Sequence, residues 1–148
     1  MILVNERLTY PRGLVGNNIY MFTANSVVNG SGKLIMGRGC AKTVRDTYQG
    51  IDKLFGDVID NMMLFGVRFV KQGSQWIGAF QTKYNWQDPS PLELVEYSVF
   101  KLAKISGVRP EYTFHLPFPA ISNGGQSVGD VLPLLQCLPD NVVVYLDK

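Results

Sequence analysis

Apolar runs and polar, glycine-bearing segments alternate along this chain, and the alternation predicts strands and helices in turn. Residues 19–24 (IYMFTA) are apolar and aromatic without polar alternation, which is typical of a strand covered on both faces. Two shorter runs on either side of Gly73-Ser74 predict a pair of strands joined by a turn. In chain order, the predicted strands cover residues 19–24, 67–70, 76–80, 112–116 and 142–146.

Two helices are predicted from the three-and-four spacing of apolar residues. The first follows a glycine-bearing stretch, and its apolar positions are Cys40, Ala41, Val44 and Tyr48. The second has the clearest periodic pattern in the chain, a core-facing stripe that comprises Ile51, Leu54, Phe55, Val58, Ile59, Met62 and Met63. The stripe therefore predicts an amphipathic helix that includes Met62 and Met63.

Two later helices are predicted mainly from their start signals. Ser90 is expected to cap a helix in which Pro91 takes the first position and Glu93 completes a capping box. The buried face of this helix is expected to comprise Leu92, Val95, Val99, Leu102 and Ile105. The last helix is expected to start near Asp130, because Pro133 is tolerated only within a first turn.

Strands that alternate with helices favour an α/β fold in which helices cover both faces of a mostly parallel sheet. The chain has 148 residues, enough for one domain with a sizeable core. No internal repeat, charge block or low-complexity linker interrupts the sequence. We therefore expect a single domain over residues 1–148.

Composition and charge narrow the class of protein. A net charge of +2 provides no strong field for nucleic acid or an acidic membrane, and 46 % hydrophobic residues exclude a disordered chain. No apolar run approaches the roughly 20 residues of a membrane span, and residues 1–10 lack the pattern of a signal peptide. Two cysteines and one histidine argue against a disulfide scaffold and a multi-histidine metal site. We expect a cytoplasmic protein that needs no metal or cofactor.

Two glycine-bearing loops follow predicted strands and precede predicted helices, which is where such sheets bind ligands. The first covers residues 25–39 and the second residues 120–127. Glycine lets backbone N–H groups approach an anion, and a helix N-terminus adds partial positive charge. Two such loops would suit a diphosphate held from both sides, with ordinary turns at helix starts as the alternative. Neither the Walker nor the Rossmann glycine pattern is present.

Three segments of the chain also occur in an order found in one known family. Ala24-Asn25 is followed by residues 36–41 (MGRGCA), similar to an Asn after a strand and an MGxGxA turn. Residues 81–86 (QTKYNW) are similar to a TKxxW segment, and residues 117–131 to a glycine-rich one, with Asn123-Gly124-Gly125 in register. Together they resemble the macro domain family, in particular compact members that act on ADP-ribose derivatives. The resemblance implies a three-layer α/β/α sandwich with a mixed, mostly parallel sheet and an ADP-ribose cleft.

The resemblance also implies which residues bind the ligand. Asn25 would bond the hydroxyls of the distal ribose, and an Asn that turns back on its own backbone is the alternative. The loops would hold the phosphates through main-chain amides, with the Arg38 side chain in solvent. The implied ligand-binding residues are Asn25, Met36, Gly37, Arg38, Gly39, Ser122, Asn123, Gly124, Gly125 and Gln126. Because the first loop is longer than usual in the family, Asn29 is an alternative to Asn25.

Lys83 is the candidate catalytic residue, since a lysine in this segment of the family's hydrolases attacks the ribose carbon or orients the reacting centre. Its amine must be unprotonated, so burial or a neighbouring cation would have to lower its pKa. The chain departs from the family at Gly13-Leu14, where an Asp often reads the adenine, and at Gln126-Ser127, where an acidic residue is common. Asp130 is the nearest carboxylate, and it is expected to cap a helix.

Packing is the expected role of several other reactive or aromatic side chains. His115 lies within a predicted strand, and Cys40 stands where the family has a small apolar residue. Three aromatic side chains, Tyr84, Trp86 and Tyr145, are alternatives for an adenine-stacking face. A third departure from the family is Ala120-Ile121-Ser122 in place of a GxG sequence.

Three functions are compatible with these residues. The first is metal-independent hydrolysis of an ADP-ribose derivative, either ADP-ribose 1''-phosphate or an ADP-ribosylated protein. The second is a non-catalytic module that recognises or sequesters ADP-ribose or a related nucleotide. The third is a single-stranded nucleic-acid binder that stacks bases on Tyr20, Phe22, Trp76 and Phe80. Near-neutral charge argues against the third.

Overall fold

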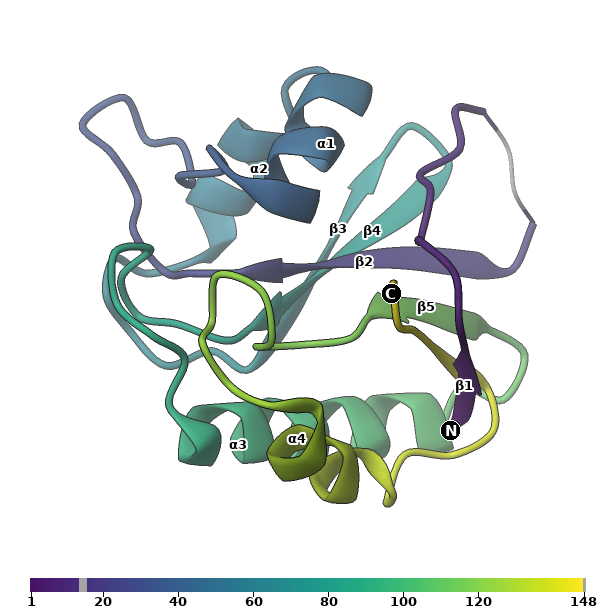
Figure 1. Ribbon diagram of the computed structural model, residues 1–148. Helices are drawn as coiled ribbons and strands as arrows, with labels where there is room; N and C mark the ends of the chain where they lie inside the picture. The colour runs from purple at the N-terminus through teal and green to yellow at the C-terminus, as the bar shows by residue number, and fades with distance from the viewer. Residues whose placement is uncertain (14–15, 148) are drawn as a thin grey trace.

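The computed structural model describes residues 1–13 and 16–147, whose arrangement is shown in Figure 1. The strands in this part of the chain are β1 (Ile2–Val4), β2 (Asn18–Ala24), β3 (Val67–Gln72), β4 (Gln75–Gln81), β5 (Thr113–Pro117) and β6 (Val142–Tyr145). They form one sheet in the order β1-β6-β5-β2-β4-β3. The β3–β4 pair is antiparallel and the other neighbouring pairs are parallel. The prediction of a mixed, mostly parallel sheet is confirmed.

The helices are α1 (Gly39–Thr47), α2 (Ile51–Val58), α3 (Leu92–Gly107) and α4 (Val128–Leu135). α1 and α2 lie over one face of the sheet, and α3 and α4 lie over the other (Figure 1). β2 sends Met21 into the core on the α3–α4 side and Phe22 into the core on the α1–α2 side. This confirms the three-layer α/β/α sandwich and explains why β2 is apolar without alternation. No helix within the described ranges is long and apolar enough to cross a membrane.

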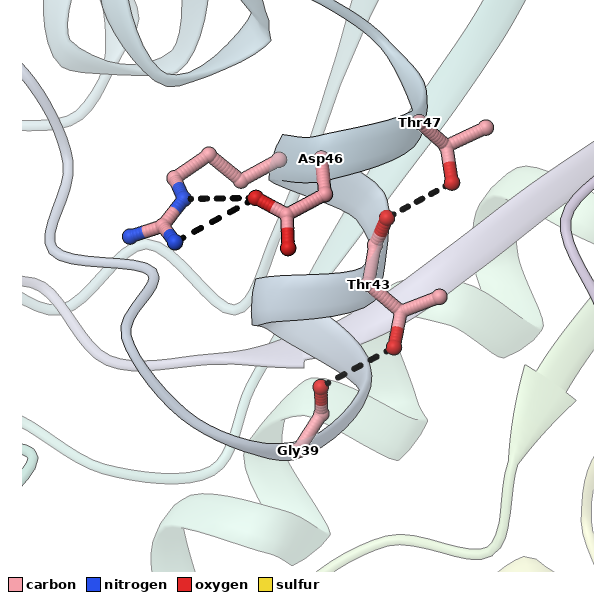
Figure 2. A network of polar contacts seen from close by, with 5 residues as sticks. Gly39, Thr43, Asp46 and Thr47 are labelled. Atoms are coloured by element: carbon pink, nitrogen blue, oxygen red, sulfur yellow. Dashed lines mark hydrogen bonds and ion pairs between the residues drawn. The ribbon is translucent and has the colours of Figure 1, made fainter.

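α1 follows the first glycine loop, as predicted, and its first turn is not capped by a protein side chain. Gly39 begins the helix with a φ of +55°, a left-handed conformation that favours glycine, and the N-cap residue Arg38 makes no side-chain cap. Figure 2 shows the side-chain bonds on this helix. The hydroxyls of Thr43 and Thr47 donate to the carbonyls of Gly39 and Thr43, at 3.3 and 2.7 Å. These bonds satisfy carbonyl oxygens and leave the first-turn N–H groups without a side-chain partner.

α2 is shorter than the apolar stripe predicts, because it ends at Val58. Met62 adopts a positive φ of +62° and is not helical. Val58, Met62 and Met63 are 45 %, 45 % and 59 % exposed, so the prediction that they face the core was wrong. The cause is a tertiary contact, since the backbone N–H of Met62 donates to the carbonyl of Ser26 and turns the chain toward the first loop.

α3 starts without the predicted capping box. Its N-cap residue is Pro91 rather than Ser90, and no side chain caps the helix. The backbone of Ser90 bonds the second glycine loop instead, with its N–H donating to the carbonyl of Gly124 at 2.9 Å. This tertiary bond overrides the local start signal. Of the predicted buried face, Val95, Val99 and Leu102 are buried, whereas Leu92 and Ile105 are only partly buried.

α4 begins two residues before the position that the sequence predicts. Its N-cap is Ser127, whose hydroxyl oxygen accepts from the backbone N–H of Asp130 at 3.1 Å. Asp130 therefore lies in the first turn and is not the cap. Pro133 lies deeper in the helix than expected, where it removes one backbone donor. Both predictions were wrong, because Ser127 at the end of the second loop takes the capping position.

β1 is a strand that the sequence pattern does not reveal. It has three residues, too few for a periodic signal, and it pairs in parallel with β6, with Ile2 opposite Val143. This pairing holds the start of the chain at one edge of the sheet. The residues that follow, Arg7–Tyr10, then pass over the carboxyl ends of the strands, where they line the cavity described below.

His115, on β5, has the packed and hydrogen-bonded position that the sequence predicts. Its ring stacks on Tyr20 with 4.6 Å between ring centroids. Nδ1 pairs with the hydroxyl of Tyr145 at 2.8 Å, and Nε2 pairs with Oδ1 of Asn18 at 2.7 Å. Burial lowers the pKa of His115 below its ordinary value, so the imidazole is neutral at pH 7.

Candidate functional site

The carboxyl ends of β2, β4, β5 and β6 border a cavity of about 870 Å³. This is the end of the sheet at which open α/β folds bind ligands, and the volume is typical of a small-molecule site. The lining comes from the strand ends, both glycine loops and the N-terminal segment, and comprises Arg7–Tyr10, Thr23–Asn25, Ile35, Gly37–Ala41, Thr43, Thr82, Lys83, Trp86, Ser90, Pro117, Phe118, Ala120–Gly124, Tyr145 and Asp147.

The two glycine loops meet at this cavity. Gly37–Gly39 line it from the first loop, and Ser122–Gly124 line it from the second. A Cβ placed on Gly39 would lie only 3.8 Å from Nδ2 of Asn123, so the loops nearly touch. The first turn of α1, with its uncapped N–H groups, adjoins the same space. The arrangement therefore presents backbone donors and a helix N-terminus to an anion.

The second loop is fastened to the segment that links β4 to α3. The amide of Gln126 donates to the carbonyl of Ser90 at 2.7 Å, and Nζ of Lys83 donates to the carbonyl of Asn123 at 2.9 Å. Gly124 packs so closely that a Cβ there would lie 2.5 Å from the carbonyl oxygen of Ala120 and 2.6 Å from Oγ of Ser90. The loop is thus held in one shape before any ligand binds.

Lys83 follows β4 and is buried to 9 % exposure. Its Nζ donates to the carbonyls of Trp86 and Asn123, at 3.3 and 2.9 Å. Burial lowers the pKa of Lys83 and the nearby Arg38 cation lowers it further, whereas Asp88 raises it. These carbonyls accept from two of the three positions on Nζ, and in an unprotonated amine the third would be the lone pair that a nucleophile needs.

Asn25 lines the cavity, yet its amide is also bonded within the protein. Oδ1 accepts from the backbone N–H of Val27 at 2.8 Å, and Nδ2 donates to the carbonyl of Ile35 at 3.0 Å. The side chain therefore turns back on its own backbone, and it keeps one amide hydrogen for a ligand. Asn29 bonds the N–H groups of Ser31 and Lys33 and is absent from the cavity lining.

Three residues that the resemblance assigns to the ligand do not line the cavity. Met36 is 2 % exposed and packs in the core on the α1–α2 side. Gly125 and Gln126 lie behind Gly124 and do not line the cavity, and Gln126 instead fastens the loop to Ser90.

The structure does not place Asp130, the carboxylate nearest to the second loop in the sequence, as an acid–base partner of Lys83. Asp130 lies in the first turn of α4, outside the cavity lining. Within the described part of the chain, the one carboxylate in that lining is Asp147, which follows β6 and pairs with Arg7 at 2.9 Å. At the other departure, Gly13-Leu14, Leu14 lies outside the described residues.

Several lining residues are not among those that the resemblance assigns to the ligand. Thr23 and Thr82 stand at the ends of predicted strands, so the strand-end rule finds their location. Arg7–Tyr10 reach the cavity only through the unpredicted pairing of β1 with β6. Cys40 also lines the cavity, and its Sγ lies 3.2 Å from Oγ1 of Thr23. Tyr84, an alternative for base stacking, does not line it, whereas Trp86 and Tyr145 do.

Ala120 adopts a left-handed conformation with a φ of +69°, which costs an L-residue other than glycine about 1–2 kcal/mol. We expect Ala120→Gly to increase the free energy of unfolding by about 1 kcal/mol, measured by chemical denaturation. Ala103→Gly, in α3, is the matched control and should lower it by about 1 kcal/mol. A loss of stability in Ala120→Gly would contradict the assigned strain.

Comparisons with known proteins identify the fold. A search with protein-family models finds no match, and neither does a search of curated proteins. Among solved structures, the chain is similar to the macrodomain of Mycobacterium tuberculosis DarG (TM-score 0.72, 21 % identity, 99 % of both chains covered) and to that of Thermus aquaticus DarG (0.72, 21 %, 99 % of this chain and 97 % of that one). It is also similar to Thermosipho africanus DarTG in complex with ADP-ribose (0.73, 20 %), where the match covers 88 % of this chain and 38 % of that one. The chain therefore has the macrodomain fold.

Proposed function

We propose that the protein binds ADP-ribose, free or attached to another molecule, in the cavity at the strand ends. The observation that carries the proposal is that Gly37–Gly39 and Ser122–Gly124, from two separate loops, line one cavity beside the uncapped start of α1. Such backbone donors suit a diphosphate. The macrodomain fold supports the proposal, because the Thermosipho africanus DarTG structure with that fold is in complex with ADP-ribose.

The order of the strands suggests how the ligand lies. Lys83 follows β4 and Asp147 follows β6, and β2 and β5 lie between these strands. Three strand spacings separate the two ends by about 14 Å. The loops after β2 and β5 occupy the middle, which suits the diphosphate. We place the reactive ribose at the Lys83 end and the adenine beside Tyr145 and Asp147.

The charge of the lining fits an anionic ligand. Arg38 lines the cavity together with the ion pair of Arg7 and Asp147, and Lys83 adds a positive charge while it is protonated. Near-neutral overall charge is thus compatible with a locally cationic site. The nucleic-acid alternative loses support, because Phe22 and Phe80 are completely buried and present no face on which a base can stack.

We further propose that the protein hydrolyses the bond at the anomeric carbon of the bound ribose. The Nζ lone pair of Lys83 attacks that carbon, and the bond to the phosphate or carboxylate leaving group breaks. Water then displaces the amine and releases ADP-ribose, so that one water is consumed overall. The burial and lowered pKa of Lys83 support this role. The alternative is a module that binds the same ligand without chemistry.

Calorimetric titration with ADP-ribose tests the proposal. We expect a Kd in the micromolar range, because neutral amides provide most of the contacts and the base lacks the family's usual Asp. Asn25→Ala should weaken binding about 10-fold by removing one hydrogen bond to the ribose. Asn29→Ala is the matched control, because Asn29 makes similar backbone bonds outside the cavity, and it should change Kd by less than about 2-fold.

A protein that does not bind ADP-ribose would contradict the proposal. Saturating ADP-ribose that yields no heat and no increase in melting temperature would exclude both the enzyme and the binding module. Repeating the titration with ADP-ribose 1''-phosphate while free phosphate is measured separates the two. Phosphate release supports the hydrolase, and binding without release supports the module.

A further inference from the structure

Arg38 is exposed, in keeping with the solvated position that the sequence suggests, and it also contacts an aromatic ring. Its guanidinium carbon lies 5.2 Å from the ring centroid of Trp86, in a cation–π contact. Arg38 belongs to the first glycine loop and Trp86 to the segment after β4, and both line the cavity. The contact therefore joins two separate parts of the cavity wall.

The guanidinium of Arg38 has no hydrogen-bond acceptor from the protein within the described ranges. It makes no side-chain hydrogen bond or ion pair with any residue in the described ranges. A guanidinium that rests its face on an aromatic ring keeps its five N–H donors directed outward in the plane. Those donors match two oxygens of a phosphate, a geometry that a lysine ammonium lacks.

Trp86 connects this cation to the reactive end of the cavity. Its indole ring contacts Arg38, and its carbonyl oxygen accepts from Nζ of Lys83 at 3.3 Å. The guanidinium is also close enough to Lys83 for its charge to lower the pKa of that amine. Arg38 is thus at the Lys83 end, on the ribose side of the diphosphate in the proposed binding mode.

We propose that Arg38, stacked on Trp86, donates hydrogen bonds to the phosphate next to the distal ribose and so selects diphosphate ligands over nucleoside monophosphates. The inference rests on the proposed function and adds a contact to it. AMP has no phosphate at this position. Arg38 consequently contributes to the affinity for ADP-ribose and not to the affinity for AMP.

The test measures Kd for ADP-ribose and for AMP in the same set of variants. Arg38→Lys keeps the charge and removes the planar donors, and Trp86→Leu removes the stacking ring while its carbonyl stays. Each should weaken ADP-ribose binding about 10-fold and change AMP binding by less than about 2-fold. The double variant should lose no more than either single one, because both changes remove the same contact.

Trp76 provides a matched control. It carries a similar cation–π contact, with Nζ of Lys71 at 5.8 Å from its ring centroid, but it does not line the cavity. Trp76→Leu should leave both affinities unchanged. Trp76→Phe leaves Trp86 as the single tryptophan, and its fluorescence should change on titration with ADP-ribose and not with AMP.

Two results would overturn the inference while the proposed function stands. One is an ADP-ribose to AMP affinity ratio in Arg38→Lys within about 2-fold of the wild type. The other is the same ratio unchanged in Trp86→Leu, which would show that the contact does not depend on stacking. A wild-type protein that binds no ADP-ribose contradicts the proposed function itself. Melting temperatures close to the wild type verify that each variant is folded.

Discussion

Replacement of Lys83 by methionine is expected to reduce hydrolysis of ADP-ribose 1''-phosphate by about 1000-fold or more, because it removes the proposed nucleophile. Methionine keeps the length of the buried side chain and lacks the amine. Binding of ADP-ribose should change far less, since the two glycine loops provide most of the contacts with the diphosphate. Single-turnover release of phosphate, measured beside calorimetric affinity, distinguishes the two effects.

The pH dependence of kcat gives an independent test of the same role. The reactive form is the neutral amine, so kcat should rise with pH through the pKa of Lys83 and then level off. Burial and Arg38 lower this pKa, so the plateau should be reached at a lower pH than an exposed lysine requires. Asp88 raises the pKa of Lys83, so Asp88→Asn should move the rising limb to lower pH, and 1 M salt should reduce that shift.

Lys83→Arg is the control for charge. Arginine keeps the cation but does not deprotonate, so it should be as inactive as methionine at every pH. Activity in either variant comparable to the wild type would exclude Lys83 as the nucleophile. If the wild type binds ADP-ribose derivatives and never releases product, the protein is a binding module and Lys83 serves to hold the second loop.

Gly56→Ala is expected to lower the free energy of unfolding by about 3 kcal/mol, although helix propensity alone would predict a gain of about 1 kcal/mol. Gly56 lies in α2, and a Cβ there would be 1.9 Å from the carbonyl oxygen of Gly32 in the first loop. The obstacle is backbone, which cannot rotate away. The same loop is also attached to α2 by a hydrogen bond, in which the backbone N–H of Leu34 donates to the carbonyl of Asp52.

Gly30→Ala is the matched control, since Gly30 belongs to the same loop and no atom lies within 4 Å of its Cβ position. Its stability should stay within about 0.5 kcal/mol of the wild type in chemical denaturation. Gly56→Ala should also weaken ADP-ribose binding, because displacement of the loop moves Ile35, whose carbonyl holds the amide of Asn25. A Gly56→Ala variant as stable as the wild type would contradict the prediction, because it would show that the first loop can move away from α2 without a loss in the free energy of unfolding.

The helix starts and ends show where reasoning from local pattern fails. The stripe from Ile51 to Met63 is helical in its spacing, yet the helix stops at Val58. The sequence of Ser90, Pro91 and Glu93 predicts a capping box, yet the backbone N–H of Ser90 donates to the second loop instead. In both places a contact with a segment far away in the sequence competes with a local preference of about 1 kcal/mol and prevails.

The environment of Lys83 is likewise decided by contacts between distant segments. Its position after a strand can be predicted from the sequence, and the carbonyl of Trp86 is local, but the carbonyl of Asn123 and the neighbouring Arg38 come from two other segments. The contact between Arg38 and Trp86 also forms only in the folded chain, because the two residues belong to different loops. A pKa depends on distances in space, and local sequence spacing does not report them.

The amino-acid sequence by itself determined the α/β class, the positions of β2 to β6 along the chain, the covered faces of the sheet and the two glycine loops that follow β2 and β5. These follow from periodicity and glycine placement, which act over a few residues. Only the tertiary structure decided the edge pairing of β1, the boundaries of α2, α3 and α4, and the environment of Lys83. These depend on contacts between distant segments, whose free energy exceeds the local preferences that a sequence pattern reports.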